Sequence, residues 1–302
     1  MIGAYMNIKG ILTFFLLLFV VHIRLLVVFV KKLPVISSIT AFIKARKQNM
    51  PADETRAARS AGGSSTYYEL RRRGALWFCG EEPFTGIVHV YYPNGKIEYE
   101  IPYKQGLIEG VKKEYNENGI LSCEFPYTQG KVEGIAKSYY EDGKLYEQTL
   151  YQQDKIQGTQ KTYYESGKPR RETPYQNDLK HGVEKEYYHK GNLMEETSYE
   201  HGYKEGLHKR YHSNGILQHE AFYEGGRIAG TSKHWHENGV LSCEGIYKHG
   251  SLDGISRSWY KNGQLERETP YVSGEVHGIE RNYDENGRLT REAPVKYGRS
   301  FD

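Results

Sequence analysis

Hydrophobic, polar and glycine residues recur along most of this chain with a period of 24 residues. A glycine opens each of nine successive copies, from Gly86 to Gly278, and no copy contains an inserted or deleted residue. Counting this glycine as position 0, an aromatic residue stands at position 5 and a second glycine at position 9 in every copy. Position 17 is a tyrosine from Tyr103 to Tyr271. A period between 20 and 50 residues indicates a repeat array.

The pattern within a copy predicts one β-hairpin. Asn precedes the second glycine in six of the nine copies, and short aromatic and aliphatic runs flank the pair. Asn-Gly is the strongest short-range signal for a type I′ turn, which requires positive φ at both central residues. With such a two-residue loop, residues whose positions add up to 17 face each other across the hairpin.

This register places opposite charges face to face. Position 3 is Lys or Arg in eight copies, and position 14 is Glu in eight copies. Opposite charges across a hairpin contribute roughly 0.2 to 1 kcal/mol per pair. The expected pairs are Lys113–Glu124, Lys161–Glu172, Lys185–Glu196, Lys209–Glu220 and Arg257–Glu268. On the other face the same register pairs position 6 with position 11, as in Tyr140–Leu145, Tyr188–Leu193 and Tyr260–Leu265.

An isolated two-stranded hairpin is only marginally stable in water, so the copies are expected to stack on one another. The predicted fold is all-β, an elongated single-layer antiparallel sheet of stacked 24-residue β-hairpin repeats, preceded by an N-terminal hydrophobic helix. Such a sheet has an open edge at each end. The segment before the first copy is placed to cover one of them.

The motif Gly-x-x-Lys-x-Tyr-Tyr-x-Asn-Gly-x-Leu-x-x-Glu-x-x-Tyr resembles the variant MORN repeat found in YwqK-type antitoxins. The resemblance covers Gly86 to about Gly298, and the stretch from Tyr67 to Gly86 resembles the segment that often precedes the array in that family. The resemblance implies a MORN-type hairpin array that acts as an antitoxin. The departures from the motif are Pro169 at the usual Leu, Asp154 and Asp178 at the third glycine, and Val295 at the last Tyr.

An apolar stretch near the N-terminus predicts a membrane anchor. Seventeen of the twenty residues from Ile11 to Val30 are apolar, which is long enough to cross a hydrocarbon core about 30 Å thick. Their summed insertion energy outweighs the roughly 3 kcal/mol cost of Arg24. A cleaved signal peptide is the alternative. It fits less well because Lys31 and Lys32 follow directly and no small-x-small cleavage site lies nearby.

The chain therefore divides into four parts. They are an anchor with a basic flank at 1–47 (span 11–30), a linker at 48–65 rich in Ala, Gly and Ser, a lead-in segment at 66–85, and nine repeats at 86–302. Basic residues follow the span, which favours a single-pass protein with a cytoplasmic array. An exported or periplasmic array remains the alternative, because a single span inserts in either sense.

Charge and cysteine content restrict the expected partners and the expected state of the thiols. The net charge is +3, but residues 1 to 60 hold nine Lys and Arg against two acids, which leaves the repeats negative. A nucleic-acid-binding domain carries a basic face, so nucleic acid is not an expected partner. Cys79, Cys123 and Cys243 form an odd set, and five repeats separate the last two. That separation exceeds disulfide reach, so reduced thiols are expected.

The sequence contains no recognisable catalytic, metal-binding or cofactor-binding motif. His234 and His236 have the two-residue spacing that places both on one face of a strand, but a metal would need further donors. No phosphate-binding loop, nucleophile elbow or zinc-protease motif occurs. The glutamates at position 14 stand opposite Lys and Arg, so they are interpreted as structural. The prediction is a protein without enzymatic activity, metal or cofactor.

The remaining candidate function is binding. Positions 4 and 13 vary freely between copies, and exposed tyrosines are common interface anchors. The predicted partner-binding residues are Tyr140, Tyr164, Tyr188, Arg210, His234 and Tyr260. The leading hypothesis is a protein-binding module, for which the resemblance implies an antitoxin or immunity protein with a cognate toxin as partner. The alternative is a membrane-tethered scaffold that binds lipid or envelope components.

Overall fold

A single antiparallel sheet contains every strand that the structure describes. The computed structural model describes residues 56–59, 67–297 and 299–300, so the predicted hydrophobic helix at 11–30 lies outside this part of the chain. The described residues form 29 strands and no helix, which confirms the all-β prediction. Accordingly, none of them forms a helix of the length and apolarity that a membrane crossing requires.

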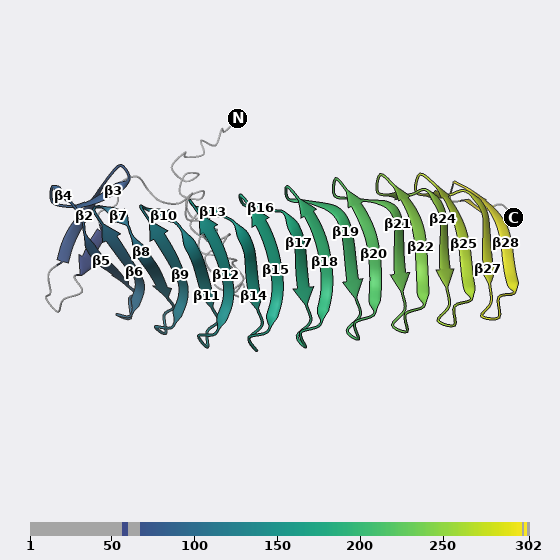
Figure 1. The fold of residues 1–302 in the computed structure, drawn as a ribbon, viewed down its shortest axis with the longest axis horizontal. Coiled ribbons are helices and arrows are strands. Elements are labelled where there is room, and N and C mark those ends of the chain that lie inside the picture. Colours follow the sequence, from purple (N-terminus) through teal and green to yellow (C-terminus); the bar gives the residue numbers. More distant parts are fainter. Residues whose placement is uncertain (1–55, 60–66, 298, 301–302) are drawn as a thin grey trace, which may run out of the picture. The chain divides into compact units, whose positions relative to one another are not determined.

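Each copy contributes two long strands, and a two-residue strand usually links it to the next copy (Figure 1). The first long strands are β5 (Gly86–Tyr91), β8 (Gly110–Tyr115), β11 (Gly134–Tyr139), β14 (Gly158–Tyr163), β17 (Gly182–Tyr187), β19 (Tyr203–Tyr211), β21 (Arg227–Trp235), β24 (Gly254–Trp259) and β27 (Gly278–Tyr283). The second long strands are β6 (Ile97–Lys104), β9 (Leu121–Thr128), β12 (Leu145–Gln152), β15 (Pro169–Gln176), β18 (Leu193–Glu200), β20 (Leu217–Glu224), β22 (Leu241–Lys248), β25 (Leu265–Val272) and β28 (Leu289–Lys296).

The two-residue strands pair with the end of the long strand that precedes them. They are β7 (Leu107–Ile108), β10 (Lys131–Val132), β13 (Lys155–Ile156), β16 (Leu179–Lys180), β23 (Ser251–Leu252), β26 (Glu275–Val276) and β29 (Arg299–Ser300). In β19 and β21 this short strand is continuous with the long strand that follows. The copies follow one another along the array in sequence order (Figure 1).

The predicted register holds along most of each hairpin and then shifts by one residue. In the second copy the pairing runs from Gly110 opposite Tyr127 to Glu114 opposite Cys123, as the period predicts. The next pair is Tyr115 opposite Leu121, because a bulge intervenes. The predicted pairs Tyr140–Leu145, Tyr188–Leu193 and Tyr260–Leu265 are therefore wrong, and the partners of these leucines are Tyr139, Tyr187 and Trp259.

The shift arises from the Asn-Gly loop, which has three residues instead of two. In the first copy the Tyr92 carbonyl accepts a hydrogen bond from Gly95 N–H at 2.9 Å, and Tyr92 N–H donates to the Lys96 carbonyl at 2.8 Å. Gly95 has a φ of 83°, whereas Asn94 keeps a negative φ. A type I′ turn would require positive φ at both residues, so that prediction is wrong. The geometry fits the three-residue loop that ends in a left-handed glycine.

The turn with two positive φ values lies at the other end of the long strands, at positions 19 and 20. Gln105 and Gly106, for example, have φ values of 49° and 80°. Asp154 and Asp178 replace the glycine in two copies and keep positive φ values of 67° and 69°. Their Oδ1 atoms accept hydrogen bonds from backbone N–H groups in the preceding copy, at 2.9 and 2.8 Å. This side-chain bond offsets part of the strain of a left-handed aspartate.

The lead-in segment packs against the first copy of the array. It contains β2 (Tyr67–Arg73), β3 (Leu76–Cys79) and β4 (Glu82–Pro83), and β1 (Arg56–Arg59) precedes it. Strand β1 lies within the predicted linker and pairs with β2 and with the outer edge of β5. The hydrophobic cluster at this contact comprises Leu70, Val88, Tyr99, Ile101 and Tyr103, with Trp77 and Phe84 packed against it.

Candidate functional site

The sheet has two faces with different composition. Positions 1, 3, 5, 14 and 16 point to one side, which we call the ladder face, and positions 2, 4, 13, 15 and 17 point to the other, which we call the variable face. Because this alternation is the same in every copy, one residue type extends along the whole array wherever a position is constant. Where a position varies, the surface changes from copy to copy.

The ladder face carries the predicted row of alternating charges. Ion pairs join Lys161 to Glu172 at 3.3 Å, Lys185 to Glu196 at 3.8 Å, Lys209 to Glu220 at 3.6 Å and Arg257 to Glu268 at 3.0 Å. Lys113 lies across from Glu124 in the backbone register, but its ammonium group binds Glu100 of the preceding copy at 3.3 Å. The glutamates thus link strands within and between copies, which supports their structural interpretation.

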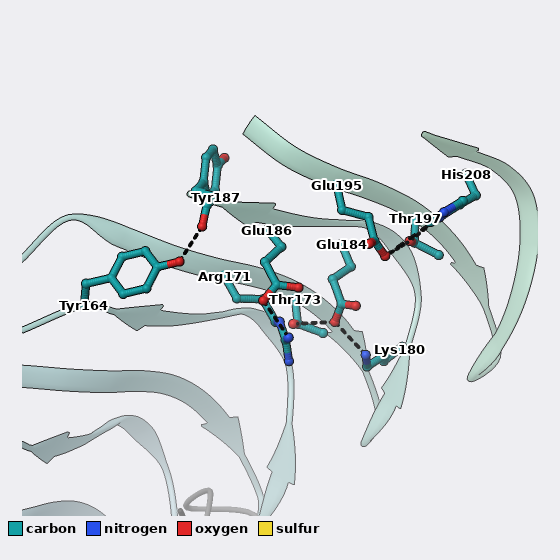
Figure 2. Close-up of polar contacts among 10 residues, drawn as sticks. All are labelled: Tyr164, Arg171, Thr173, Lys180, Glu184, Glu186, Tyr187, Glu195, Thr197 and His208. Atoms are coloured by element: carbon teal, nitrogen blue, oxygen red, sulfur yellow. Dashed lines mark hydrogen bonds and ion pairs between the residues drawn. The ribbon is translucent and has the colours of Figure 1, made fainter. Parts of the chain in front are cut away.

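Four of the six predicted binding residues lie at the start of the loop that joins the two long strands of a copy. The hydroxyl groups of Tyr140, Tyr164, Tyr188 and Tyr260 each donate to a backbone carbonyl in the next copy, at 2.6 to 2.9 Å. Figure 2 shows one such bond, from Tyr164 to the carbonyl of Tyr187. His212 and His236 occupy the same position and place Nε2 2.9 Å from the corresponding carbonyl. These side chains therefore join neighbouring copies.

The other two predicted residues, Arg210 and His234, lie on the variable face in one continuous row. Positions 4 and 13 are direct partners across each strand pair, both within and between copies. From the fourth copy to the seventh the row contains Arg171, Glu186, Glu195, Arg210, His219, His234 and Cys243. The structure thus places these variable positions on one face, in adjacent strands.

A network of charged and hydroxyl side chains occupies the variable face at β15 to β18 (Figure 2). Arg171 Nη2 donates to Glu186 Oε1 at 2.9 Å. Glu184 Oε2 accepts hydrogen bonds from Thr173 Oγ1 at 2.7 Å and from Lys180 Nζ at 2.6 Å. All of these side chains are at least half-buried, so their orientations are set before any partner arrives.

Lys180 also contacts an aromatic ring. Its Nζ lies 4.6 Å from the centroid of the Tyr199 ring, a cation–π contact. Burial, with Glu184 and Glu195 nearby, raises the pKa of Tyr199 to about 12. The tyrosine is therefore a neutral hydrogen-bonding group throughout the physiological range. Lys204 and Tyr223 repeat the arrangement in the next copy, at 5.3 Å.

A row of imidazoles continues the network towards the C-terminus. His208 is buried, and its Nδ1 lies 2.9 Å from Thr197 Oγ1. Its ring centroid lies 5.3 Å from that of His219, which in turn stacks on His234 at 4.2 Å. Burial, together with His234 and His208, lowers the pKa of His219 to about 4. These rings are consequently neutral at pH 7 and act as aromatic and hydrogen-bonding surface.

The cysteines on the variable face have the properties of unreactive thiols. Burial raises the pKa of Cys123 to about 12, with Glu114 and Glu147 adding to the shift, and burial also raises the pKa of Cys243. A thiol with a raised pKa is a poor nucleophile at neutral pH. Within the described part of the chain, no three His, Cys, Asp or Glu side chains are arranged to hold a metal ion. His234 and His236 contact different neighbours, His219 and Trp259.

Sequence reasoning missed the network around Glu184. The signal that could have found it is position 22, which is aliphatic in most copies but Lys in two successive ones, Lys180 and Lys204. A lysine there places its ammonium group beside the position-17 tyrosine of the next copy and the position-2 residue of that copy. The lysines at position 22 therefore bring ammonium groups to the variable face, beside Tyr199 and Tyr223.

The repeat pattern and the fold agree with one known family. The family described as MORN repeat variant matches nine stretches of the chain, at residues 84–105, 108–129, 132–153, 156–177, 180–201, 204–224, 229–249, 252–273 and 276–297. No curated protein matches the chain. The family matches cover well over half of the sequence, each spans the hairpin of one copy, and together they follow the 24-residue period. The chain belongs to the MORN repeat variant family.

Proposed function

We propose that this protein is a non-enzymatic binding module that holds a protein partner on the variable face of its fourth to seventh copies. The observation that carries the proposal is the preorganised network of Arg171, Lys180, Glu184 and Glu186, followed by the stacked imidazoles. MORN repeats are in general modules that bind proteins or membranes. A surface that varies on a constant backbone is the usual means by which repeat arrays select a partner.

The chemistry of this surface defines the partner. The charged groups of the network are already paired with each other, so a partner gains little from a single ion pair. It gains more by matching the order of groups along the row, first charged and then aromatic. Such a match gives specificity and fixes the register of the partner along the array. We therefore infer a folded or extended protein segment that spans several strands.

The finer form of this proposal is that the partner is a toxin and that this chain is its antitoxin or immunity protein. The resemblance of the repeat motif to YwqK-type antitoxins supports it. In this form, tight and stoichiometric binding neutralises the toxin without any chemical step by the antitoxin. The apolar stretch 11–30 and its basic flank then hold the pair at a membrane, with the array on the cytoplasmic side.

The second candidate is a membrane-tethered scaffold that binds lipid or envelope components. The same apolar stretch and basic flank favour it, because anionic headgroups attract clustered Lys and Arg. In this case the membrane segment provides the specificity and the array acts as a spacer. The two candidates differ in which part of the chain retains the ligand.

The test is affinity purification of the tagged full-length chain from detergent-solubilised native cells, with mass spectrometry of the bound proteins and lipids. One protein retained in a stoichiometric amount supports the binding module, and toxicity of that protein when expressed alone supports the antitoxin form. Retention of lipid without a stoichiometric protein would contradict both and favour the scaffold.

A further inference from the structure

A row of exposed hydrophobic side chains runs along the ladder face. Among the described residues, fifteen large hydrophobic side chains are exposed, and nine of them occupy positions 1 and 16 of the copies. Their exposed fractions lie between 38% and 51%. We call this set the apolar row: Ile87, Val111, Ile135, Val183, Leu207, Phe222, Ile246, Ile255 and Ile279. An exposed apolar row of this kind is typical of an interaction surface.

The apolar row extends within and between copies, and Thr159, Ser198 and Thr231 interrupt it. Within a copy, position 1 lies directly across from position 16, as Leu207 does from Phe222. Between copies, the residue at position 16 lies against the position-0 glycine that follows it in seven cases, and Gly230, which follows Phe222, is the exception. A Cβ atom on Gly254 would lie only 3.2 Å from Ile246, and one on Gly134 would lie 3.3 Å from Pro126. The glycine is therefore needed for the hydrophobic side chains of neighbouring copies to meet.

The charges beside the apolar row identify the partner. Positions 3 and 14 alternate in sign from strand to strand, from Lys113 opposite Glu124 to Arg281 opposite Glu292, except at the neutral Gln148. A partner of one charge sign would therefore meet as much repulsion as attraction. A second molecule of this chain fits. If the two molecules are related by a two-fold axis that runs parallel to the strands and midway between two neighbouring strands, each cation lies opposite an anion. The same axis places apolar row on apolar row, which makes the surface self-complementary.

The size of the surface agrees with a dimer. Nine side chains, each exposed by about two fifths, present on the order of 700 Å² of surface per chain. A standard interface buries about 800 Å² per partner. The repeat periods of the two molecules also match, since a second molecule has the same spacing of hydrophobic side chains along its array.

We propose that the apolar row joins two molecules of this chain, packed ladder face on ladder face with their arrays antiparallel. In this arrangement the variable faces of both molecules point outwards. The proposal is therefore independent of the proposed function, and the dimer presents two identical partner surfaces.

The test is the mass of the full-length chain in detergent, measured by sedimentation velocity at concentrations up to about 100 µM. The double variant Leu207→Glu/Phe222→Glu places like charges in the apolar row. The matched control is Leu179→Glu/Tyr203→Glu, because these are also large exposed hydrophobic residues, at 48% and 66%, but lie at position 21, outside the row. Circular dichroism establishes that all three proteins are folded.

Wild type and control are expected to be dimers, and the dissociation constant of the row variant is expected to rise by at least about 100-fold. A monomeric wild type, or a row variant that dimerises as tightly as the control, would overturn the proposal. If the row variant does not fold, a photo-crosslinking amino acid at Phe222 tests the same contact. Crosslinks to the ladder face of a second chain are then expected, and crosslinks only to other surfaces would refute it.

Discussion

At the scale of single residues, one backbone position shows how this array tolerates exceptions. Position 20 requires a left-handed conformation, which glycine adopts without strain. Asp178 takes the same conformation, with a φ of 69°, and its Oδ1 accepts a hydrogen bond from the backbone N–H of Ile156 at 2.8 Å. The aspartate is thus strained in this conformation where glycine is not, but its side chain forms a hydrogen bond to the preceding copy. Glycine has no side chain with which to form this bond.

This account predicts different effects for two substitutions at that position. Asp178→Ala keeps the strain and loses the acceptor, so it should lower the free energy of unfolding by about 1 to 2 kcal/mol. Asp178→Gly loses the acceptor but also the strain, so its cost should be less than half as large. Urea denaturation of the two variants and wild type measures both values. Equal costs would show that the hydrogen bond has no role in the tolerance of aspartate.

A second residue-scale prediction concerns pH. The pKa of His219 is about 4 in the folded chain, because the ring is buried beside two other imidazoles, against about 6.5 when unfolded. The unfolded state therefore takes up the extra proton first as pH falls. The stability that the neutral ring provides is fully present above pH 6.5 and is lost as pH falls towards 4.

We expect wild type to lose about 1 to 2 kcal/mol more than His219→Gln does between pH 7 and pH 5. Thermal unfolding of both proteins at a series of pH values measures the difference. Parallel curves for the two proteins would mean that His219 does not titrate in this window.

At the scale of elements, stacking depends on hydrogen bonds between successive hairpins as well as on side-chain packing. The tyrosine or histidine at position 6 contacts the backbone carbonyl of the next copy, for example at 2.7 Å from Tyr188 to Tyr211. Asn262 Nδ2 forms a similar bond to the Glu285 carbonyl at 2.8 Å. The loops that join the two long strands of each copy thus form a ladder of hydrogen bonds along the array.

Removal of one hydroxyl from this ladder should weaken the array. Tyr188→Phe leaves the Tyr211 carbonyl without its side-chain donor, and we expect a loss of about 1 kcal/mol. Tyr203→Phe is the control, because that side chain is 66% exposed, and its effect should fall within about 0.5 kcal/mol of zero. Guanidinium denaturation compares the two. A loss for the control as large as that for Tyr188→Phe would contradict the role of the ladder.

At the scale of the whole array, the two faces differ in how far the sequence predicts them. The register and the charge ladder follow from the period, because seven of the nine copies place Lys or Arg opposite Glu at fixed positions. The turn type was predicted wrongly, because Asn-Gly also suits a three-residue loop, and nothing local distinguishes the two. The network around Glu184 was missed because Lys180 precedes the strand that carries Glu184, and its role depends on how the linking strand β16 folds back on β15.

The central claim is that the variable face of the fourth to seventh copies holds the partner. The most direct test is retention of the purified partner by the full-length chain with Arg171→Gln/Glu186→Gln. The control is Arg281→Gln/Glu292→Gln, which removes an ion pair of the same 2.9 Å length from the ladder face. We predict that the variable-face variant binds the partner at least about tenfold more weakly and that the control binds as wild type does. Equal binding by both variants would contradict the claim.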